Sequence, residues 1–278
     1  MYLTRHQTAQ GPRWARDDHF LPAAFDLGLL LQLPRAAIEG FLRSIPCPER
    51  ASGALLPPVE PTHEVWACGV TYLRSREARE AESTVKDVYS RVYDAKRPEL
   101  FWKGIGWRAV GHQAPIRVRA DSAWNVPEPE LTLVINAQAE IVGYCVGNDV
   151  SSRDIEGENP LYLPQAKVYR GSCAVGPGIL LQPAETLRDL SIQISISRGG
   201  RQVFAGETRT SQIKRPLEEL ASYLAMELDF PRGAFLMTGT GIVPPHDFSM
   251  QSGDVVRISI GTLTLENEVS PPSAAGQR

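Results

Sequence analysis

The sequence predicts a mixed, mainly β fold in which most strands pair antiparallel. Many apolar segments are short and alternate with polar residues; residues 190–198 (LSIQISISR), for example, place Ile192, Ile194 and Ile196 on one face. The connections between segments are rich in turn-forming residues, with 23 glycines and 22 prolines in 278 residues. Segments with helical periodicity are few, so strands dominate the expected fold.

Composition narrows the class of protein. Hydrophobic residues make up 42% and charged residues 22%, as in ordinary globular proteins. The net charge of -3 gives no long-range attraction to polyanions, so we expect neither a nucleic-acid nor a membrane partner. The first 18 residues lack the apolar core of a secretory signal, and the longest apolar run, Phe25 to Leu33, is too short to span a bilayer. Four scattered cysteines without a CxxC motif suggest buried thiols in a reducing compartment, which predicts a cytoplasmic protein.

Residues 1–63 are expected to form a small N-terminal α+β domain. Within them, Pro34 to Ser44 reads as a helix with proline in its first turn. The proline-rich stretch 55–58 (LLPP) marks a linker to the main domain. The main domain is expected to cover residues 64–270, followed by a disordered tail at 271–278.

The main domain begins with a strand at Glu64 to Val70. A charged stretch (residues 72–83) and a helix from Thr84 to Lys96 come next, before a strand resumes at Leu100 to Lys103. A charged helical insertion between two strands is either a lid over a site or a solvated surface helix, and the sequence does not separate the two.

The remaining elements continue the alternation of strands and turns. In order, they are a strand at Ala114 to Val118, a glycine-rich turn at Gly171 to Pro177, a hairpin of Leu190 to Arg198 with Gln202 to Glu207, an amphipathic helix at Pro216 to Glu227, and a hairpin of Asp254 to Ile260 with Leu263 to Val269.

Three carboxylates stand at the ends of one predicted hairpin. Glu128 and Glu130 are two residues apart, so in a strand both side chains point to the same face. A four-residue loop, Ala137 to Glu140, would place Asp149 opposite Glu128 and Gly147 opposite Glu130. All three carboxylates would then share one face, with open space beside Gly147.

Clustered carboxylates repel one another, and a hard divalent cation such as Mg²⁺ or Mn²⁺ would stabilise an all-oxygen set. The alternative is a group of surface carboxylates on a solvated sheet edge, and the spacing alone leaves both open. Lys167, farther along, could steady an enolate or act as an acid or base, although an isolated lysine is more often a surface residue.

Six sequence motifs follow one another along the chain. They are ExE (128–130), GNDVSSRD (147–154), QAK (165–167), GSCAVGP (171–177), MTGTGIVPP (237–245) and SGDVVRISI (252–260). Over residues 64–270 this series resembles the fumarylacetoacetate hydrolase superfamily. The resemblance implies a rolled β-sandwich, a homodimer or homotetramer, and Mg²⁺ held by two glutamates and an aspartate.

Transferred residue by residue, the resemblance assigns metal ligation to Glu128, Glu130 and Asp149. It assigns a catalytic role to Lys167 and a substrate contact to Thr240. On the predicted lid, Glu82 is a candidate acid or base and Arg76 a candidate substrate ligand, with ordinary exposed side chains as the alternative for both.

One departure from the hydrolase pattern bears on the reaction. Hydrolases of this superfamily carry a water-activating histidine on the lid, where this chain has Ser75, and no histidine lies between His63 and His112. The segments GVTYLRSREAR, RPELFWK and SSRDIEGENPLYLPQAK are most similar to the branch that dehydrates 2-keto-3-deoxy sugar acids, of the 2-keto-3-deoxy-D-arabinonate dehydratase type.

The resemblance therefore implies a Mg²⁺-dependent dehydration of a 2-keto-3-deoxy sugar acid, with a pentonate yielding 2-oxoglutarate semialdehyde. In that chemistry the metal polarises the C2 carbonyl and stabilises the enolate formed when a C3 proton leaves, while an acid assists departure of the C4 hydroxyl. Two alternatives stay open. One is a C–C bond hydrolase of an acylpyruvate or diketo acid, for which His246 could supply the missing histidine. The other is a non-catalytic sugar-acid binding protein.

Overall fold

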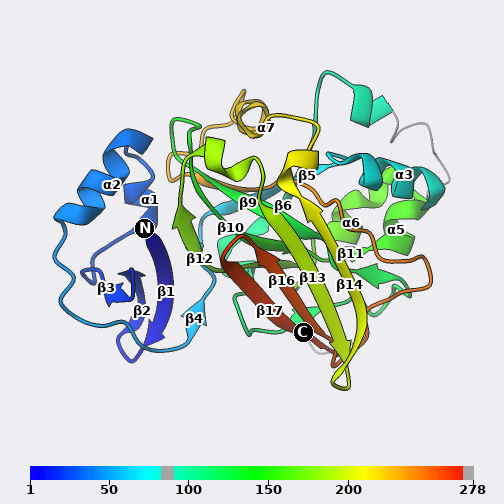
Figure 1. Cartoon of the computed structure of the whole chain (residues 1–278), viewed down its shortest axis with the longest axis horizontal. Helices are drawn as coiled ribbons and strands as arrows, with labels where there is room; N and C mark the ends of the chain where they lie inside the picture. Colours follow the sequence, from blue (N-terminus) through cyan, green and yellow to red (C-terminus); the bar gives the residue numbers. More distant parts are fainter. Residues whose placement is uncertain (83–90, 272–278) are drawn as a thin grey trace.

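The structure, a computed structural model, describes residues 1–82 and 91–271. Its largest sheet contains β1 (Tyr2–Thr8), β2 (Gly11–Arg16), β3 (His19–Phe20), β4 (Leu55–Leu56), β5 (Glu64–Gly69), β6 (Glu99–Ile105), β9 (Pro129–Ile135), β10 (Ile141–Asp149), β12 (Cys173–Leu181) and β15 (Ala234–Met237). The strand order is β3-β2-β1-β12-β10-β9-β15-β5-β6, with β4 paired to β1 (Figure 1). Most neighbours are antiparallel, and β15 with β5 is a parallel pair.

A second sheet of five strands lies across the first. It is made of β7 (Ile116–Arg117), β13 (Ser191–Arg198), β14 (Arg201–Arg209), β16 (Val255–Ile260) and β17 (Leu263–Ser270), in the order β14-β13-β16-β17-β7. The two hairpins predicted in this part of the chain are confirmed as β13–β14 and β16–β17. A small two-stranded sheet joins β8 (Asn125–Val126) to β11 (Ser151–Ser152).

The large sheet curls until its two sides meet. Beyond β6, Val110 forms a parallel bridge with Ala174 of β12. The amide of Val110 donates to the Cys173 carbonyl at 2.8 Å, and the amide of Val175 donates to the Val110 carbonyl at 2.8 Å. The strands from β12 round to β6 therefore enclose an interior, and the predicted mixed, mainly β roll is confirmed.

Strand β9 is buried on both faces, and its alternation separates two cores. Leu131 and Leu133 face the five-stranded sheet and pack with residues such as Ile194. Val134 points to the interior of the roll, where it packs with residues such as Phe235. Because even-numbered residues of β9 point inward, Glu128 and Glu130 also face the interior of the roll.

The N-terminal part packs helices against the outer end of the large sheet. Helices α1 (Leu27–Leu30) and α2 (Arg35–Ser44) cover it, and the helix predicted from Pro34 is confirmed, with the proline immediately before the first helical residue. Strand β1 pairs with β12, so residues 1–63 extend the same sheet (Figure 1). The division into domains at residues 63 and 64 stays a prediction.

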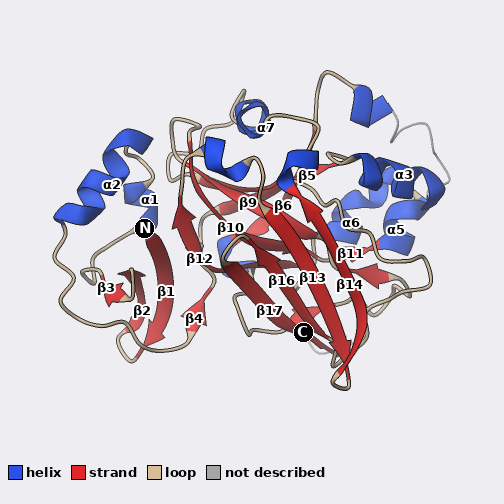
Figure 2. Ribbon diagram, viewed as in Figure 1, coloured by secondary structure: helices blue, strands red, loops and turns tan. Residues whose placement is uncertain are grey.

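The other helices gather mostly at one end of the roll, as Figure 2 shows. They are α3 (Leu73–Glu82), α5 (Arg153–Glu158), α6 (Leu163–Lys167) and α7 (Leu217–Leu224), with short 3-10 turns at Gly106–Arg108, Pro160–Tyr162, Ala184–Leu187 and Thr210–Gln212. Most of the predicted helix at 84–96 and the tail from residue 272 lie outside the described residues. None of the described helices has the length and apolar character needed to cross a bilayer.

One predicted turn is confirmed only at its start, where the chain turns at residues 170–171 and Gly171 has a φ of 75°. The run Gly171 to Pro177 was expected to bend, yet β12 begins at Cys173 and continues to Leu181. Gly176 lies inside this strand, where a Cβ atom would approach Leu265 Cδ1 to 3.1 Å. The glycine therefore allows close packing between the two sheets instead of a turn.

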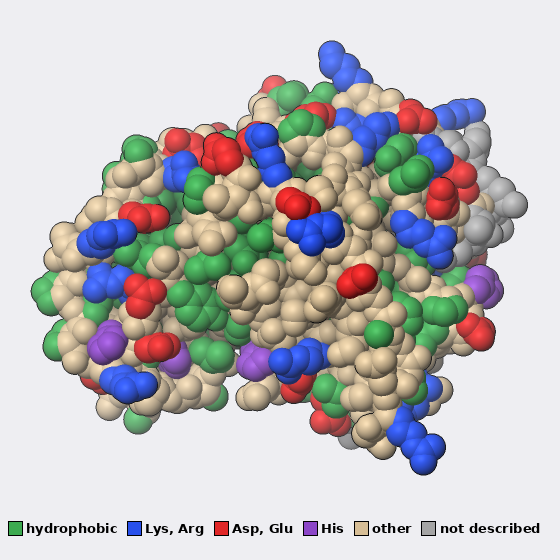
Figure 3. Space-filling model, in the orientation of Figure 1, with side chains coloured by type: hydrophobic (Ala, Val, Ile, Leu, Met, Phe, Trp, Pro, Cys, Tyr) green, Lys and Arg blue, Asp and Glu red, His purple; other side chains and the backbone are tan. Residues whose placement is uncertain are grey.

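Surface charges are mixed in sign. On the face shown in Figure 3, basic and acidic side chains are interspersed, without a large area of one charge. This distribution agrees with the net charge of -3.

Candidate active site

The hairpin of β9 and β10 has the predicted register at its functional end. Gly147 pairs with Glu130, and the Asp149 amide donates to the Glu128 carbonyl at 3.0 Å. The turn end differs from the expectation, because Ile141 pairs with Ile135 and a bulge before Gly143 shifts the register by one residue. Without that bulge, Asp149 would point to the other face of the sheet.

The three carboxylates meet inside the roll. One oxygen from each of Glu128, Glu130 and Asp149 lies within 4.8 Å of the others, and all three residues are buried. The alternative of a solvated sheet edge is therefore wrong. Burial raises the pKa of the Glu130 carboxyl well above its usual value, and the charges of Asp149 and Glu128 raise it further. One oxygen of Glu130 accepts a hydrogen bond of 2.6 Å from the Gly239 amide.

The space beside Gly147 is filled, which corrects the expectation of an opening there. A Cβ atom at Gly147 would lie 2.2 Å from Thr132 Oγ1 and 3.1 Å from Met237 Cε. Two neighbouring side chains on the inner face thus use the room left by the glycine. The cavity lies on the other side of the carboxylates.

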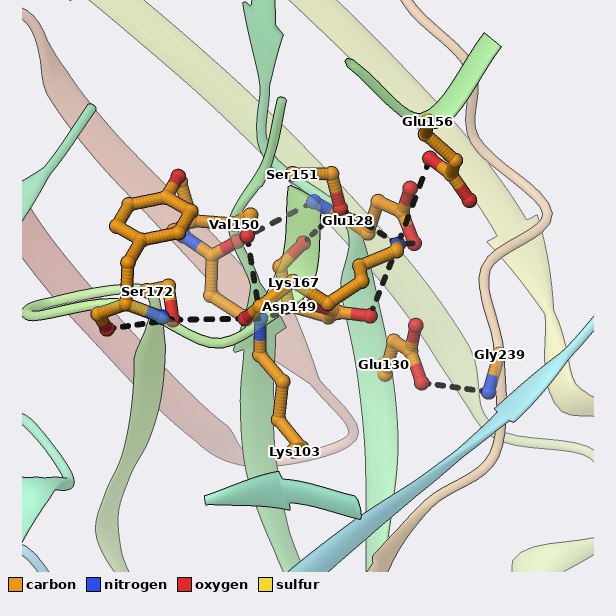
Figure 4. A network of polar contacts seen from close by, with 12 residues as sticks. Lys103, Glu128, Glu130, Asp149, Val150, Ser151, Glu156, Lys167, Ser172 and Gly239 are labelled. Atoms are coloured by element: carbon orange, nitrogen blue, oxygen red, sulfur yellow. Dashed lines mark hydrogen bonds and ion pairs between the residues drawn. The ribbon is translucent and has the colours of Figure 1, made fainter. Parts of the chain in front are cut away.

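Lys167 lies at the end of α6, and its side chain points at the carboxylates (Figure 4). Its Nζ is 2.9 Å from Glu128 Oε2 and 3.1 Å from Asp149 Oδ2. It also donates to Ser151 Oγ at 2.6 Å. Lys167 is buried, so the interpretation of this lysine as a surface residue is wrong.

A small cavity of about 20 Å³ opens beside this cluster. It is lined by Cys68, Gly69, Val70, Ser75, Glu99, Phe101, Glu128, Asp149, Glu156, Leu163, Lys167, Gly239 and Thr240. Thr240, the predicted substrate contact, and Ser75 both face it and are buried. Among these lining residues there is no histidine, and His246 instead packs against Trp124 with ring centroids 4.4 Å apart.

Of the two predicted lid residues, only the side chain of Arg76 lies in the described part of the structure. The Nε atom of Arg76 is 3.4 Å from Glu80 Oε1, and its guanidinium lies over the ring of Tyr93. Arg76 is not among the described residues that line the cavity. Glu82 ends α3, but its side chain lies outside the described part of the structure. The roles of both residues stay predictions.

Four charged residues at the site were not predicted from the sequence. Glu99 and Glu156 line the cavity, and Glu156 Oε2 is 4.0 Å from Lys167 Nζ. Arg153 Nη2 is 3.0 Å from Glu128 Oε1, and Lys103 forms an ion pair with Asp149. One signal was available, since Arg153 and Glu156 are three residues apart and can share one face of a helix.

The assembled site combines two kinds of chemistry. Its convergent carboxylate oxygens are ligands suited to a hard divalent cation. Its lysine lies within hydrogen-bonding distance of those oxygens and also lines the cavity, where a bound molecule could exchange a proton with it. Polar groups from β6, β10, β11 and α6 meet in this arrangement.

Known proteins resemble this chain in sequence. A probable 2-keto-3-deoxyxylonate dehydratase of Haloferax volcanii is 49% identical over 209 residues, covering 74% of this chain and 72% of that protein. A 2-dehydro-3-deoxy-D-arabinonate dehydratase of Saccharolobus solfataricus is 43% identical over 211 residues, covering 74% of this chain and 70% of that protein.

Solved structures resemble it over nearly the whole chain. The apo form of a 2-keto-3-deoxy-D-arabinonate dehydratase superposes with a TM-score of 0.85 at 33% identity, covering 99% of this chain and 100% of the other. The same type of enzyme complexed with magnesium and 2,5-dioxopentanoate gives a TM-score of 0.79 at 34% identity, covering 98% and 100%.

The sequence model of the fumarylacetoacetate (FAA) hydrolase C-terminal region matches residues 64–270. This range contains β5 to β17 and every residue that lines the cavity. The chain therefore belongs to the fumarylacetoacetate hydrolase family.

Proposed function

We propose that this protein is a Mg²⁺-dependent dehydratase of a 2-keto-3-deoxy sugar acid, with a pentonate as substrate and 2-oxoglutarate semialdehyde as product. The similarity to two dehydratases of 2-keto-3-deoxy sugar acids supports a hydro-lyase. The observation that carries the proposal is the cluster of three buried carboxylates and Lys167 beside a cavity, among whose described lining residues there is no histidine.

The residues present fit a divalent cation, and we propose Glu128, Glu130 and Asp149 as its ligands. Their oxygens converge within 4.8 Å inside the protein, and the pKa of Glu130 is raised by burial first and then by the charges of Asp149 and Glu128. Mg²⁺ suits such an oxygen set, with Mn²⁺ as the second choice, and a structural neighbour is complexed with magnesium. When bound, a cation of this kind supplies Lewis-acid polarisation of a keto oxygen.

We propose Lys167 as the group that handles a proton next to the substrate. Its ammonium is held by Glu128, Asp149 and Ser151, so it points to one position without solvent contact. Glu156, 4.0 Å away, is a second group through which a proton could pass. Glu82 stays a proposed alternative for the acid or base on α3.

Two further residues are proposed to bind the substrate. Thr240 faces the cavity, and its Oγ1 accepts a 3.2 Å hydrogen bond from the Ile242 amide, which fixes the hydroxyl beside the ligand space. Arg76 would have to leave Glu80 and Tyr93 to reach a bound sugar acid. It is therefore the weaker of the two assignments.

The proposal is tested by metal removal. The protein is treated with EDTA, and consumption of 2-keto-3-deoxy-pentonate is followed before and after addition of Mg²⁺ or Mn²⁺. We expect turnover only after a divalent cation returns, with Mg²⁺ sufficient. Equal turnover in EDTA would contradict the metal assignment, and binding of the sugar acid without any turnover would support a binding protein instead.

The quaternary structure and location are proposals of the same kind. We propose a homodimer or homotetramer, to be checked by sedimentation equilibrium, where a monomeric mass would contradict it.

All four cysteines are free, and three are buried, which fits a reducing compartment. We propose the cytoplasm, to be checked by cell fractionation.

A further inference from the structure

A buried lysine that the proposed chemistry does not use lies directly behind the carboxylate cluster. Lys103 comes from β6, and its side chain is 0% exposed. Figure 4 shows its side chain pointing toward Asp149 and the Val150 carbonyl. Lys103 is not among the residues that line the cavity.

The Lys103 ammonium has three oxygen partners, two of them hydrogen-bonded carbonyls and the third an ion-paired carboxylate. Its Nζ forms an ion pair with Asp149 Oδ1, donates to the Val150 carbonyl at 3.1 Å, and donates to the Lys167 carbonyl at 2.5 Å. The contacts join three segments that are far apart in sequence: β6, the end of β10 and the end of α6. A buried ammonium needs such partners, and here they tie Lys103 to both Asp149 and Lys167.

The contact with Asp149 gives its two carboxylate oxygens different partners. Lys103 is ion-paired with Oδ1, while Oδ2 lies 3.1 Å from Lys167 Nζ, and Asp149 lines the cavity. With Oδ1 held from behind, rotation of the carboxylate is restricted. Asp149 therefore presents one defined oxygen to whatever binds beside Glu128 and Glu130.

The contact with the Lys167 carbonyl fixes the backbone of the proposed catalytic lysine. The same oxygen also accepts a 2.8 Å hydrogen bond from Ser172 Oγ. Two donors thus fix the backbone at the last residue of α6, from which the Lys167 side chain extends to Glu128 and Asp149.

We propose that Lys103 is a positioning residue, which orients the Asp149 carboxylate for metal binding and sets the backbone from which Lys167 reaches the substrate. This inference rests on the proposed function, because it assumes that Asp149 binds a cation and that Lys167 is catalytic. Lys103 itself touches neither the cavity nor the reacting atoms.

The test measures Mg²⁺ binding directly, by titration calorimetry on EDTA-treated protein, in the wild type and in Lys103→Met. Methionine keeps much of the length and the apolar stem and removes the ammonium. Groups that orient metal ligands typically change metal affinity by about 10- to 100-fold, and we expect a loss in that range. We also expect a reduced kcat at saturating Mg²⁺, because Lys167 is displaced even when the metal is bound.

Arg198→Met is the matched control. Arg198 forms an ion pair with Asp254, which is also fully buried, but this pair lies in the five-stranded sheet away from the cavity. The control likewise removes a cation from a buried aspartate. We expect it to lower the unfolding temperature while leaving Mg²⁺ affinity unchanged, which separates loss of stability from loss of positioning.

Lys103→Arg provides a second variant if Lys103→Met does not fold. The guanidinium keeps the charge, but its planar array of donors does not match three acceptors arranged around an ammonium. We expect weaker Mg²⁺ binding than in the wild type. A folded Lys103 variant of either kind with wild-type Mg²⁺ affinity and wild-type kcat would overturn the inference.

Failure of the inference differs from failure of the proposed function. If the wild type itself does not bind Mg²⁺, the proposed function fails and Lys103 has no metal ligand to orient. If the wild type binds Mg²⁺ and turns over substrate while the Lys103 variants match it, only the positioning role fails.

Discussion

At the scale of single residues, the proposed ligands make the clearest prediction. We expect Glu130→Gln to lower turnover by about 100-fold or more, because it replaces a charged ligand at a site that supplies Lewis-acid chemistry. Circular dichroism should show an intact fold, since Gln keeps the shape and can still accept from the Gly239 amide. Glu268→Gln, on the exposed side of β17, is the control and should retain full activity. An active Glu130→Gln protein with an unchanged Mg²⁺ response would refute the ligand assignment.

The sequence predicted site residues correctly where their positions depend only on spacing within one strand or one hairpin. Glu128 and Glu130 share a face because any strand places residues two apart on the same side, and the short hairpin then brings Asp149 to them. Lys103 could not be found in this way. Its contacts with Asp149 and Lys167 depend on how the whole sheet closes, and no local pattern encodes that closure.

At the scale of elements, the β9–β10 hairpin predicts the effect of a small substitution. Gly147→Ala places a methyl group 2.2 Å from Thr132 Oγ1, so we expect the free energy of unfolding to fall by about 1–3 kcal/mol. The measurement is urea denaturation. The same substitution in a Thr132→Ala background should cost less, because the clashing hydroxyl is gone. Equal costs in both backgrounds would show that Thr132 is not the obstacle.

The connection between the N-terminal part and β5 predicts a pH dependence. His63 is buried, with Nδ1 accepting from the Glu60 amide at 2.9 Å and Nε2 2.8 Å from the Arg232 carbonyl. Burial lowers the pKa of His63 and outweighs the charge of Glu60 and the hydrogen bond to the Arg232 carbonyl, both of which raise it. The folded state therefore disfavours the protonated form, whereas the unfolded chain takes up a proton as the pH falls below about 6.5.

Stability should accordingly decline as the pH falls through this range. We expect His63→Gln to weaken that decline, measured by urea denaturation at pH values of about 5.5 and 7.5, on either side of the ordinary histidine pKa. His112, whose pKa burial also lowers, should account for part of what is left. His246→Gln serves as the control, because His246 is exposed, and should leave the decline unchanged. The account of His63 fails if its variant keeps the full wild-type dependence.

Elements were predictable to different degrees. The alternating strands β13, β16 and β17 followed from their period, because one face of each is buried and the other is less so. Strands β1 and β2 were missed, since their polar residues mask the alternation. The Gly171 to Pro177 run was misjudged, because glycine in a strand can serve close packing as well as a turn.

At the scale of the whole molecule, the roll explains how the site forms. The bridge between Val110 and Ala174 closes the large sheet, and this closure brings Lys103 on β6 behind Asp149 on β10. Strand periodicity indicated many antiparallel strands but not their order. The rolled architecture came from the series of motifs, which the match over residues 64–270 confirms.

The central claim concerns which bond breaks, and the mass of the product tests it most directly. The protein is incubated with 2-keto-3-deoxy-pentonate and Mg²⁺, and all products are analysed by mass spectrometry. The account predicts a product lighter than the substrate by one water, with the carbon chain intact, as expulsion of the C4 hydroxyl requires. Release of pyruvate or another carbon fragment would contradict it and show that a C–C bond is cleaved.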